Sequence, residues 1–352
     1  LRAGIGMGGE AQGDVLVNIE NVGGSYYDDY LSGDSKANVL TGNNGNDLLY
    51  GREGDDTLDG GAGIDHLDGG NGIDTITYAS YFRGIGVNLG LDSGGDGDTL
   101  SSIENAIGSA FNDFLYGGAY GNRLEGGGGD DWIDGLDGND RLEGGSGNDL
   151  LFGGQGNDIL MPGSDLSWMD GGIGTDTLSY ADLDQAVSVI LHESEPTGDT
   201  AGEAFVNGES KDSFWNVENV TGSAFGDSLT GNAMANVLRG LSGNDTLAGN
   251  GGADVLVGDG GADVMSGGAG ADRFDYNRIT DSRGSTVDRI TDFDFDDVID
   301  LSSIDAITST SGNQAFDFIA QADFTGAAGQ LRYDIINGGA DTAVFGDVNG
   351  DG

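Results

Sequence analysis

The chain contains no cysteine, which excludes disulfide bonds and thiolate metal ligands. Its 352 residues include only 2 prolines, 2 histidines and 13 basic residues, against 61 acidic ones. The formal net charge of −48 argues against nucleic acid and anionic membranes as partners, because both would be repelled, and it favours cations. No apolar run approaches the roughly 18 residues of a transmembrane helix. The opening residues also lack the basic start and apolar core of a secretory signal.

Glycine is the residue present in excess, with 70 copies. High glycine together with high net charge is typical of disordered chains, which bury too little apolar surface to offset the entropy of ordering. Periodicity argues against disorder here. Nine-residue units run in phase through residues 24–77, 108–179 and 222–275, and the eighth residue is apolar in all twenty units. A disordered chain has no reason to keep such a register.

The repeat unit reads G-G-x-G-x-D-x-U-x, where U is apolar. Its glycine half permits positive φ and close backbone approach, so it predicts a turn. Its x-U-x half predicts a three-residue strand with one inward side chain. Because one inward residue cannot form a core alone, the units are expected to stack as a parallel right-handed coil with two units per turn. The predicted fold is an all-β parallel β-roll or β-helix solenoid in three blocks, joined by short β linkers.

Position six is Asp or Asn in nineteen of the twenty units, so the coil would carry a column of carboxylates along each edge. Like charges stacked in this way repel one another unless a cation neutralises them. A hard cation that takes six or more oxygens from carboxylates and turn carbonyls fits the arrangement, and the flexible geometry of calcium suits it better than the octahedron of magnesium. Nonapeptide repeats of this type form calcium-binding parallel β-helices.

The repeat resembles the RTX family, the calcium-binding β-roll repeats of bacterial proteins exported by type I secretion, and the resemblance covers residues 24–275. It implies about ten calcium ions, held by position-six aspartates and by backbone carbonyls of the glycine turns. The aspartates are Asp47, Asp56, Asp65, Asp74, Asp131, Asp140, Asp149, Asp158, Asp176, Asp245, Asp254, Asp263 and Asp272. The position-four glycines of these turns are Gly45, Gly54, Gly63, Gly129, Gly138, Gly147, Gly156, Gly243, Gly252 and Gly261.

The first two units of each block differ from the rest because their fourth residue is not glycine, as at Tyr27 and Phe111. A bulky side chain there would obstruct an ion-binding turn. We therefore expect these opening pairs to be apolar caps that end the roll without calcium, since the terminal repeats of solenoids are atypical.

One unit inside the second block is also irregular. Pro162 replaces the glycine of position one, Asp165 the glycine of position four, and Ser167 the carboxylate of position six. The nine-residue phase nevertheless continues, so we expect a single turn that lacks calcium while the coil goes on.

Between the blocks, residues 78–107 and 180–221 show strand-like alternation and predict β linkers. Each block follows an I-E-N or V-E-N motif, and Asp92, Asp96 and Asp98 are interpreted as solvated loop acids. Residues 1–23 match only the second half of a linker, which predicts that the chain is part of a longer protein.

Residues 276–352 resemble the C-terminal domain of serralysin-type proteases and other RTX exoproteins, through D-x-I-x-D-F at Asp288–Phe293, "VIDLSSID", "GQLRYD" and "GDVNGDG". The resemblance implies a short β cap on the last roll, followed by an uncleaved signal for the type I secretion machinery. We expect Asp292 to be a further metal ligand.

Catalytic residues are scarce. His66 and His192 are the only histidines, H-E-x-x-H is absent, and no G-x-S-x-G nucleophile elbow occurs. We therefore expect no enzymatic activity in this chain, while a catalytic domain upstream of residue 1 stays open.

The leading hypothesis is a structural and display module of a secreted or cell-surface bacterial protein that folds on extracellular calcium. The alternative is a polysaccharide-binding RTX module attached to an upstream extracellular epimerase, protease or lipase; contact with other copies of the chain also stays open. Outward aromatic rings that would stack on sugars are Tyr50, Tyr116, Trp132, Phe152 and Trp168. Shielding of the roll's flank is the favoured interpretation of these rings.

Overall fold

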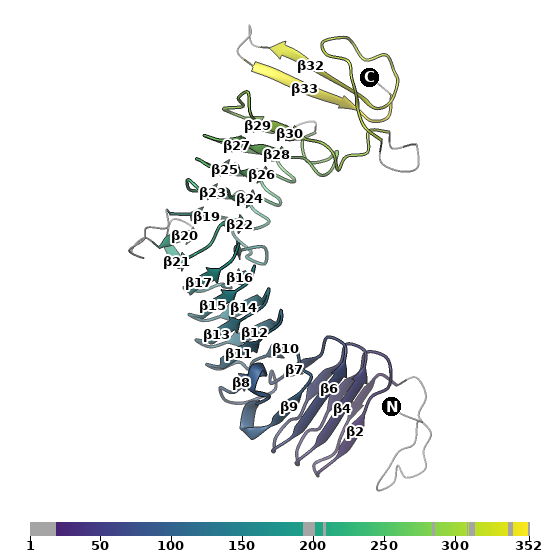
Figure 1. Cartoon of the computed structure of the whole chain (residues 1–352), viewed down its shortest axis with the longest axis vertical. Helices are drawn as coiled ribbons and strands as arrows, with labels where there is room; N and C mark the ends of the chain where they lie inside the picture. Colours follow the sequence, from purple (N-terminus) through teal and green to yellow (C-terminus); the bar gives the residue numbers. More distant parts are fainter. Residues whose placement is uncertain are drawn as a thin grey trace.

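The computed structural model of the chain describes residues 19–192, 201–206, 209–283, 286–307, 309, 314–336 and 341–350. Short strands joined by glycine turns wind into one elongated, bent coil with two flanking sheets (Figure 1). Among the described residues, no helix is long and apolar enough to cross a membrane. The predicted all-β parallel roll is confirmed, while residues 1–18 of the expected first linker lie outside the described part.

One flank of the coil is a 14-stranded parallel sheet that runs through all three blocks. Within a block, paired residues are 18 positions apart, as in the pair Asp131 and Asp149, so two nine-residue units make one turn. Along the sheet the strands are β1 (Asn21–Gly23), β3 (Val39–Thr41), β5 (Thr57–Asp59), β7 (Thr75–Thr77), β10 (Asn105–Ile107), β12 (Arg123–Gly128), β14 (Arg141–Ser146), β16 (Ile159–Met161), β18 (Thr177–Ser179), β22 (Asn219–Thr221), β24 (Val237–Arg239), β26 (Val255–Val257), β28 (Arg273–Asp275) and β30 (Val298–Asp300).

The opposite flank is divided into a 4-stranded and a 12-stranded sheet. The first holds β2 (Tyr30–Ser32), β4 (Leu48–Glu53), β6 (His66–Asn71) and β9 (Thr99–Ser101). The second holds β8 (Gly86–Asn88), β11 (Phe114–Gly118), β13 (Trp132–Leu136), β15 (Leu150–Gln155), β17 (Trp168–Ile173), β21 (Glu209–Trp215), β20 (Gly202–Val206), β19 (Val187–Ile190), β23 (Ser228–Thr230), β25 (Thr246–Ala248), β27 (Val264–Ser266) and β29 (Arg289–Ile290). In the 12-stranded sheet β20 pairs antiparallel with β19 and with β21, whereas the other pairs are parallel.

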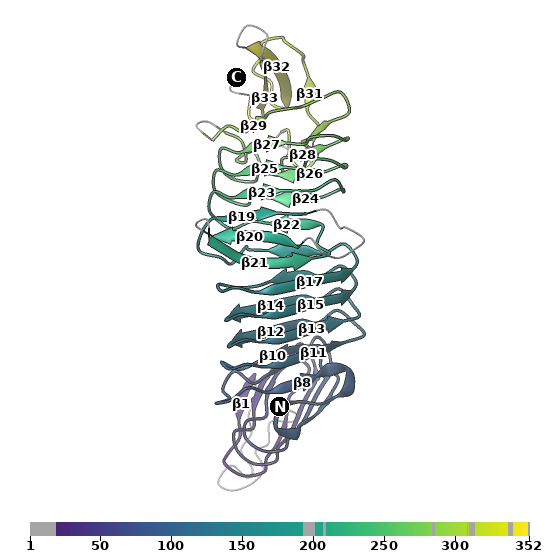
Figure 2. The same cartoon turned by 90° about the vertical axis from the view of Figure 1, so that its left-hand side faces the viewer.

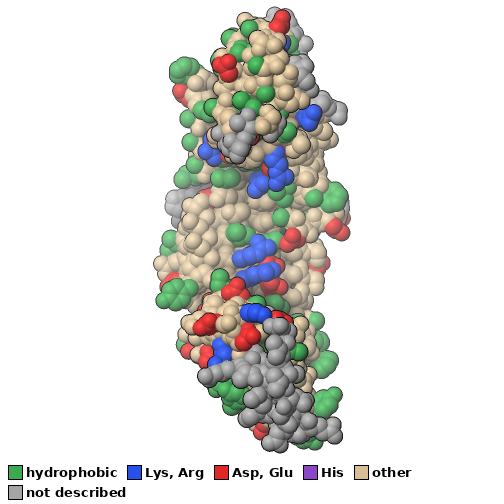
Figure 3. All heavy atoms as spheres, turned by 90° about the vertical axis from the view of Figure 1, so that its right-hand side faces the viewer, with side chains coloured by type: hydrophobic (Ala, Val, Ile, Leu, Met, Phe, Trp, Pro, Cys, Tyr) green, Lys and Arg blue, Asp and Glu red, His purple; other side chains and the backbone are tan. Residues whose placement is uncertain are grey.

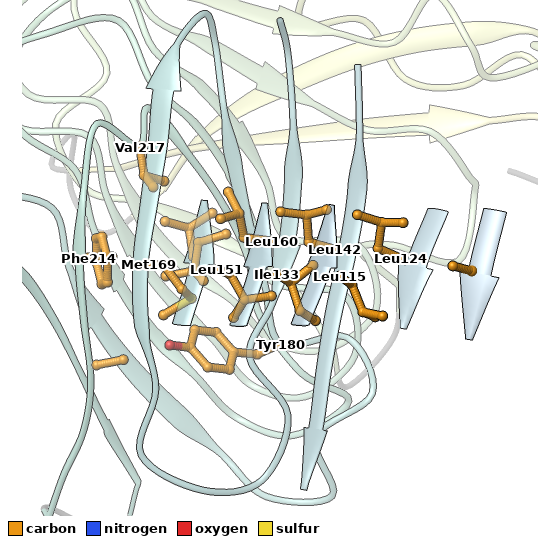
Figure 4. Close-up of a cluster of buried hydrophobic side chains, with 14 of the residues drawn as sticks. Leu115, Leu124, Ile133, Leu142, Leu151, Leu160, Met169, Tyr180, Phe214 and Val217 are labelled. Atoms are coloured by element: carbon orange, nitrogen blue, oxygen red, sulfur yellow. The ribbon is translucent and has the colours of Figure 1, made fainter. Parts of the chain in front are cut away.

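The core is a thin double row of position-eight side chains between the two flanks. Leu115 and Leu151 come from one sheet, Leu124 and Leu142 from the other, and the two rows face each other (Figure 4). Position eight is buried in every unit except the first, where Leu31 is partly buried. The periodicity of the sequence therefore predicts this core residue by residue.

The segments between the blocks are part of the coil. Residues 78–107 supply strands β8 to β10, together with the short 3₁₀ turns η3 (Leu89–Leu91) and η4 (Gly95–Gly97), and residues 180–221 supply β19 to β22. Ala106 and Val220 on these strands are buried at the place of a position-eight residue. The apolar row of the 14-stranded sheet is therefore continuous from block to block.

In the second and third blocks the opening units do not end the roll. Strand β11 pairs with β8 and β13, and β12 pairs with β10 and β14, so both lie inside their sheets. For these two blocks the expectation of terminal caps is wrong, because the linker strands supply the neighbours that an end would lack.

The C-terminal residues continue the coil before they leave it. Strands β29 and β30 add one more layer to each flank, beyond the last repeat unit. A three-stranded sheet of β31 (Asp317–Phe318), β32 (Gln330–Ile336) and β33 (Asp341–Asp347) then stands at the end of the rod (Figures 1 and 2). The predicted C-terminal β domain is thereby confirmed.

The outward face of the 14-stranded sheet is mixed in charge (Figure 3). Arg123 bridges Glu125 and Glu143 at 2.7 and 3.1 Å, and Arg141 reaches Glu143 at 2.6 Å. Exposed pairs of this kind contribute little stability. They do balance the charge locally, so the large negative excess of the chain is not concentrated in this part of the surface.

The glycine turns stack closely on one another. Gly147 has φ +124°, and a Cβ on it would lie less than 3.0 Å from the Gly129 carbonyl oxygen, one turn earlier. Each position-four glycine in the regular units therefore meets backbone where any side chain would stand, which is why the sequence repeats glycine there.

We expect Gly147→Ala to lower the free energy of unfolding by more than about 2 kcal/mol, through the positive φ and the collision with backbone. Gly86→Ala is the matched control, because a Cβ there meets no atom within 4 Å, and its effect should stay within about 0.5 kcal/mol. Denaturant unfolding monitored by circular dichroism measures both. Equal effects of the two substitutions would contradict this account of the turns.

Candidate metal centres

Carboxylates at position six are tied into columns by backbone hydrogen bonds. The N–H of Asp47 donates to Oδ1 of Asp65 at 2.7 Å, and the N–H of Asp131 donates to Oδ1 of Asp149 at 2.9 Å. Each bond spans one turn of the coil, so one oxygen of each carboxylate is committed to the backbone.

The second oxygen has no partner. In all thirteen predicted ligands Oδ2 is buried and makes no hydrogen bond within the described residues. One oxygen each of Asp59 and Asp288 is also buried without a hydrogen bond in the described residues. An ionised carboxylate that is buried without compensation is costly. The columns therefore require either protons or cations.

Backbone carbonyls face the same points as these oxygens. A Cβ built on Gly42 would lie less than 3.0 Å from both Asp47 Oδ2 and the Gly60 carbonyl oxygen, so the two oxygens converge on one small space. The same convergence occurs at Asp56 with Gly69, Asp131 with Gly144, Asp140 with Gly153, Asp158 with Gly171, and Asp254 with Gly267. Carboxylate and carbonyl oxygens are the donors that calcium prefers, so the residues fit this ion.

The converging carbonyls belong to position one, which the sequence analysis did not name. The ten predicted position-four glycines lie in the same stacked turns, and nine of them have positive φ. Gly45, for example, donates its N–H to the Ala62 carbonyl at 3.0 Å, which fixes the turn. Their role as carbonyl ligands stays a prediction.

Burial governs the titration of the columns. It raises the pKa of Asp131 to about 8, and the charge of Asp149 one turn away adds to the shift. Burial likewise raises the pKa values of Asp140 and Asp245 to about 7. Ionised carboxylates are thus disfavoured at these places in the metal-free fold.

In the opening units of the blocks, the position-six side chains have hydrogen-bond partners within the protein. Oδ2 of Asp113 accepts the Ser109 N–H at 2.5 Å, and Asn122 donates its amide to the Glu104 carbonyl at 2.6 Å. These side chains are satisfied without a cation. This supports the expectation that the opening units bind no calcium, although their place inside the coil was not foreseen.

The glutamate of the I-E-N motif is part of the column. Oε2 of Glu104 accepts the Asp74 N–H, and Oε2 of Glu218 accepts the Asp176 N–H, both at 2.8 Å. The sequence analysis noted the motif without a role. Counting the nine-residue phase backward from residue 108 places Glu104 at position six, and this signal would have identified it.

The predicted ligand Asp292 stays a prediction, but its surroundings differ from those of the thirteen aspartates. Oδ2 of Asp292 accepts a hydrogen bond from the Ser266 hydroxyl at 2.6 Å. The two carboxylate oxygens also accept the backbone N–H groups of Gly267 and Gly268. Asp288 instead continues the column, because its Oδ1 accepts the Asp263 N–H at 3.0 Å and its Oδ2 is buried without a partner. The geometry favours Asp288 over Asp292, and the signal was its place directly before strand β29.

In the irregular unit, the single hydroxyl oxygen of Ser167 continues the hydrogen-bond column. Ser167 Oγ accepts the Asp149 N–H at 3.2 Å and donates to the Pro162 carbonyl at 3.4 Å. Strands β15 and β17 pair across it, so the prediction that the coil continues is confirmed. The absence of calcium there stays a prediction.

Asp98 is not a solvated loop acid. It is 2% exposed, its Oδ1 accepts the Asp65 N–H at 2.8 Å, and its Oδ2 accepts the Tyr78 hydroxyl at 2.9 Å. The expectation fails because the chain returns to the same column at Asp98, 33 positions after Asp65. Asp96 pairs with Arg83 nearby.

Comparison with known protein families finds two matches. The family described as RTX calcium-binding nonapeptide repeat matches in four copies, at residues 23–58, 41–76, 107–142 and 134–165. The family described as peptidase M10 serralysin C terminal matches residues 227–349. No curated protein matches the chain. Together with the columns of carboxylates, these matches identify a chain of RTX calcium-binding repeats that ends in a serralysin-type C-terminal domain.

Proposed function

We propose that this chain is the calcium-triggered folding and display module of a secreted bacterial protein. One observation carries the proposal: thirteen buried carboxylate oxygens stand in columns without a partner in the described structure. Backbone carbonyls converge on the same points, as at Asp47 and Gly60. A row of calcium ions would supply the compensation that these oxygens lack at neutral pH.

The two oxygens of each aspartate have different proposed roles. Oδ1 of each aspartate fixes the turn before it, and Oδ2 with the glycine carbonyls would hold the ion. Calcium, when bound, supplies charge neutralisation and cross-links successive turns. About ten ions would cancel about 20 of the negative charges and leave a soluble acidic rod.

Calcium concentration then acts as the folding signal. Extracellular calcium sites work near about 0.1–1 mM, far above cytosolic levels. Inside the cell the carboxylates repel one another and the chain stays unfolded, which suits passage through a type I exporter. Outside, the binding free energy becomes folding free energy. The serralysin-type C-terminal region is the part proposed to contact the exporter.

A second candidate is binding of an extracellular polysaccharide. All three tryptophans lie on strands of the 12-stranded sheet, at Trp132, Trp168 and Trp215. Trp132 packs on Phe152 at 4.9 Å between ring centroids and Trp168 on Trp215 at 5.9 Å, which shields the flank. Trp168 is still 52% exposed, and such a ring offers a stacking surface for a sugar.

We expect the chain to be largely unfolded in chelator and to gain β structure in about 1 mM calcium, because the ions neutralise the buried columns. Far-ultraviolet circular dichroism during a calcium titration measures this, with magnesium as the control ion. Full β structure in the presence of chelator near neutral pH would contradict the proposal.

In chelator, β structure should increase as the pH is lowered. Burial raises the pKa of Asp131 to about 8 and that of Asp140 to about 7, so the folded chain binds more protons than the unfolded chain. The stability that these protons give the folded chain is fully present below about pH 4, the pKa of an aspartate in the unfolded chain. It is lost as the pH rises through about 6 to 8. A circular dichroism signal in chelator that instead grows between about pH 5 and 8 would overturn this linkage.

If a glycan stacks on the roll, Trp168→Ala should abolish its binding in calcium. Tyr120→Ala is the control, since Tyr120 is 81% exposed but lies outside the strands of that sheet. Glycan-array binding measures both variants, and binding that survives Trp168→Ala removes the aromatic platform.

A further inference from the structure

The column of the second block ends at an aspartate that is fully engaged by the protein. Asp212 has a side chain that is 0% exposed, and its Oδ1 accepts the Ser167 N–H at 2.8 Å. Its Oδ2 accepts the Tyr180 hydroxyl at 2.7 Å and Lys211 Nζ at 2.8 Å. The ammonium therefore lies against the oxygen that is unpaired in the thirteen predicted ligands.

A β-bulge places the lysine there. Ala204 pairs with Asp212 and Phe205 pairs with Ser210, so Lys211 is the extra residue between β20 and β21. Neighbouring residues of a regular strand point to opposite faces, but a bulge re-aims one of them. Lys211 is accordingly only 6% exposed, and its Nζ lies 5.1 Å from the centre of the Tyr180 ring.

The two other columns on this edge end without a lysine. Asp98 has the tyrosine alone, since Tyr78 donates to its Oδ2 and no ion pair among the described residues involves it. Burial, and then the charge and hydrogen bond of Asp288, raise the pKa of Tyr276, and no ion pair among the described residues involves Asp288. The three tyrosines each follow the last unit of a block, so the lysine is the feature specific to the middle column.

We propose that the Lys211 ammonium replaces a calcium ion at Asp212, so that the last layer of the second column binds no metal. This inference rests on the proposed calcium columns. A buried monovalent cation satisfies the carboxylate, and its charge repels a second cation from the same oxygen. Together with Ser167 one layer before, it gives two successive layers on this edge that are closed by protein groups alone.

The test counts calcium ions bound to the folded full chain, by equilibrium dialysis and native mass spectrometry. Asp149→Asn should lower the count by at least one, whereas Asp212→Asn should leave it unchanged. A count that Asp212→Asn also lowers would overturn the lysine assignment and leave the columns intact. A count that neither substitution lowers would instead reject the calcium columns themselves.

Stability in saturating calcium gives a second readout. Lys211→Met leaves the buried Asp212 carboxylate without a counter-charge, and it should lower the midpoint of thermal unfolding by about 5 °C. The double variant Lys211→Met with Asp212→Asn removes both charges and should recover most of that loss. It also repeats the calcium count if Asp212→Asn alone fails to fold. A wild-type midpoint for Lys211→Met, or no recovery in the double variant, would show that the ammonium has no such role.

Discussion

The coil depends on one hydrogen bond, from the N–H of a position-six residue to the side-chain oxygen of the position-six residue one turn later. This bond aligns successive turns and thereby sets the register of both flanking sheets. It also has a cost, because it draws a carboxylate into the interior with only one of its two oxygens satisfied. The need for a compensating proton or cation therefore follows from the way in which the turns are aligned.

Substitutions at position six adjust that need without breaking the column. Aspartate leaves one oxygen open, as at Asp131, whereas asparagine donates its own amide, as at Asn122. Serine offers a single oxygen at Ser167, and glutamate reaches the same backbone donor from Glu104. The column therefore tolerates several side chains that accept one hydrogen bond. Only aspartate in a glycine turn leaves a buried oxygen to which a metal ion could bind.

Much of this structure could be predicted from the sequence because the residues that determine each turn lie close together in the sequence. Period nine places the core residues and the thirteen aspartates, since each unit repeats its own local geometry. The layers completed by Asp98 and Asp212 were not predictable in this way. Their partners stand 33 and 45 residues earlier, and the path between them follows no repeat. Lys211 depends further on a bulge that no composition signal reveals.

The motif that precedes each block has a consequence for how such a chain changes in length. Glu104 and Glu218 accept the same backbone donor that an aspartate would accept, and Ala106 and Val220 fill the same apolar row. The motif therefore joins two blocks without interrupting the hydrogen-bond column or the apolar row. Duplication or loss of an entire block would preserve both the hydrogen-bond columns and the core, so that the rod can evolve in length without any redesign of its ends.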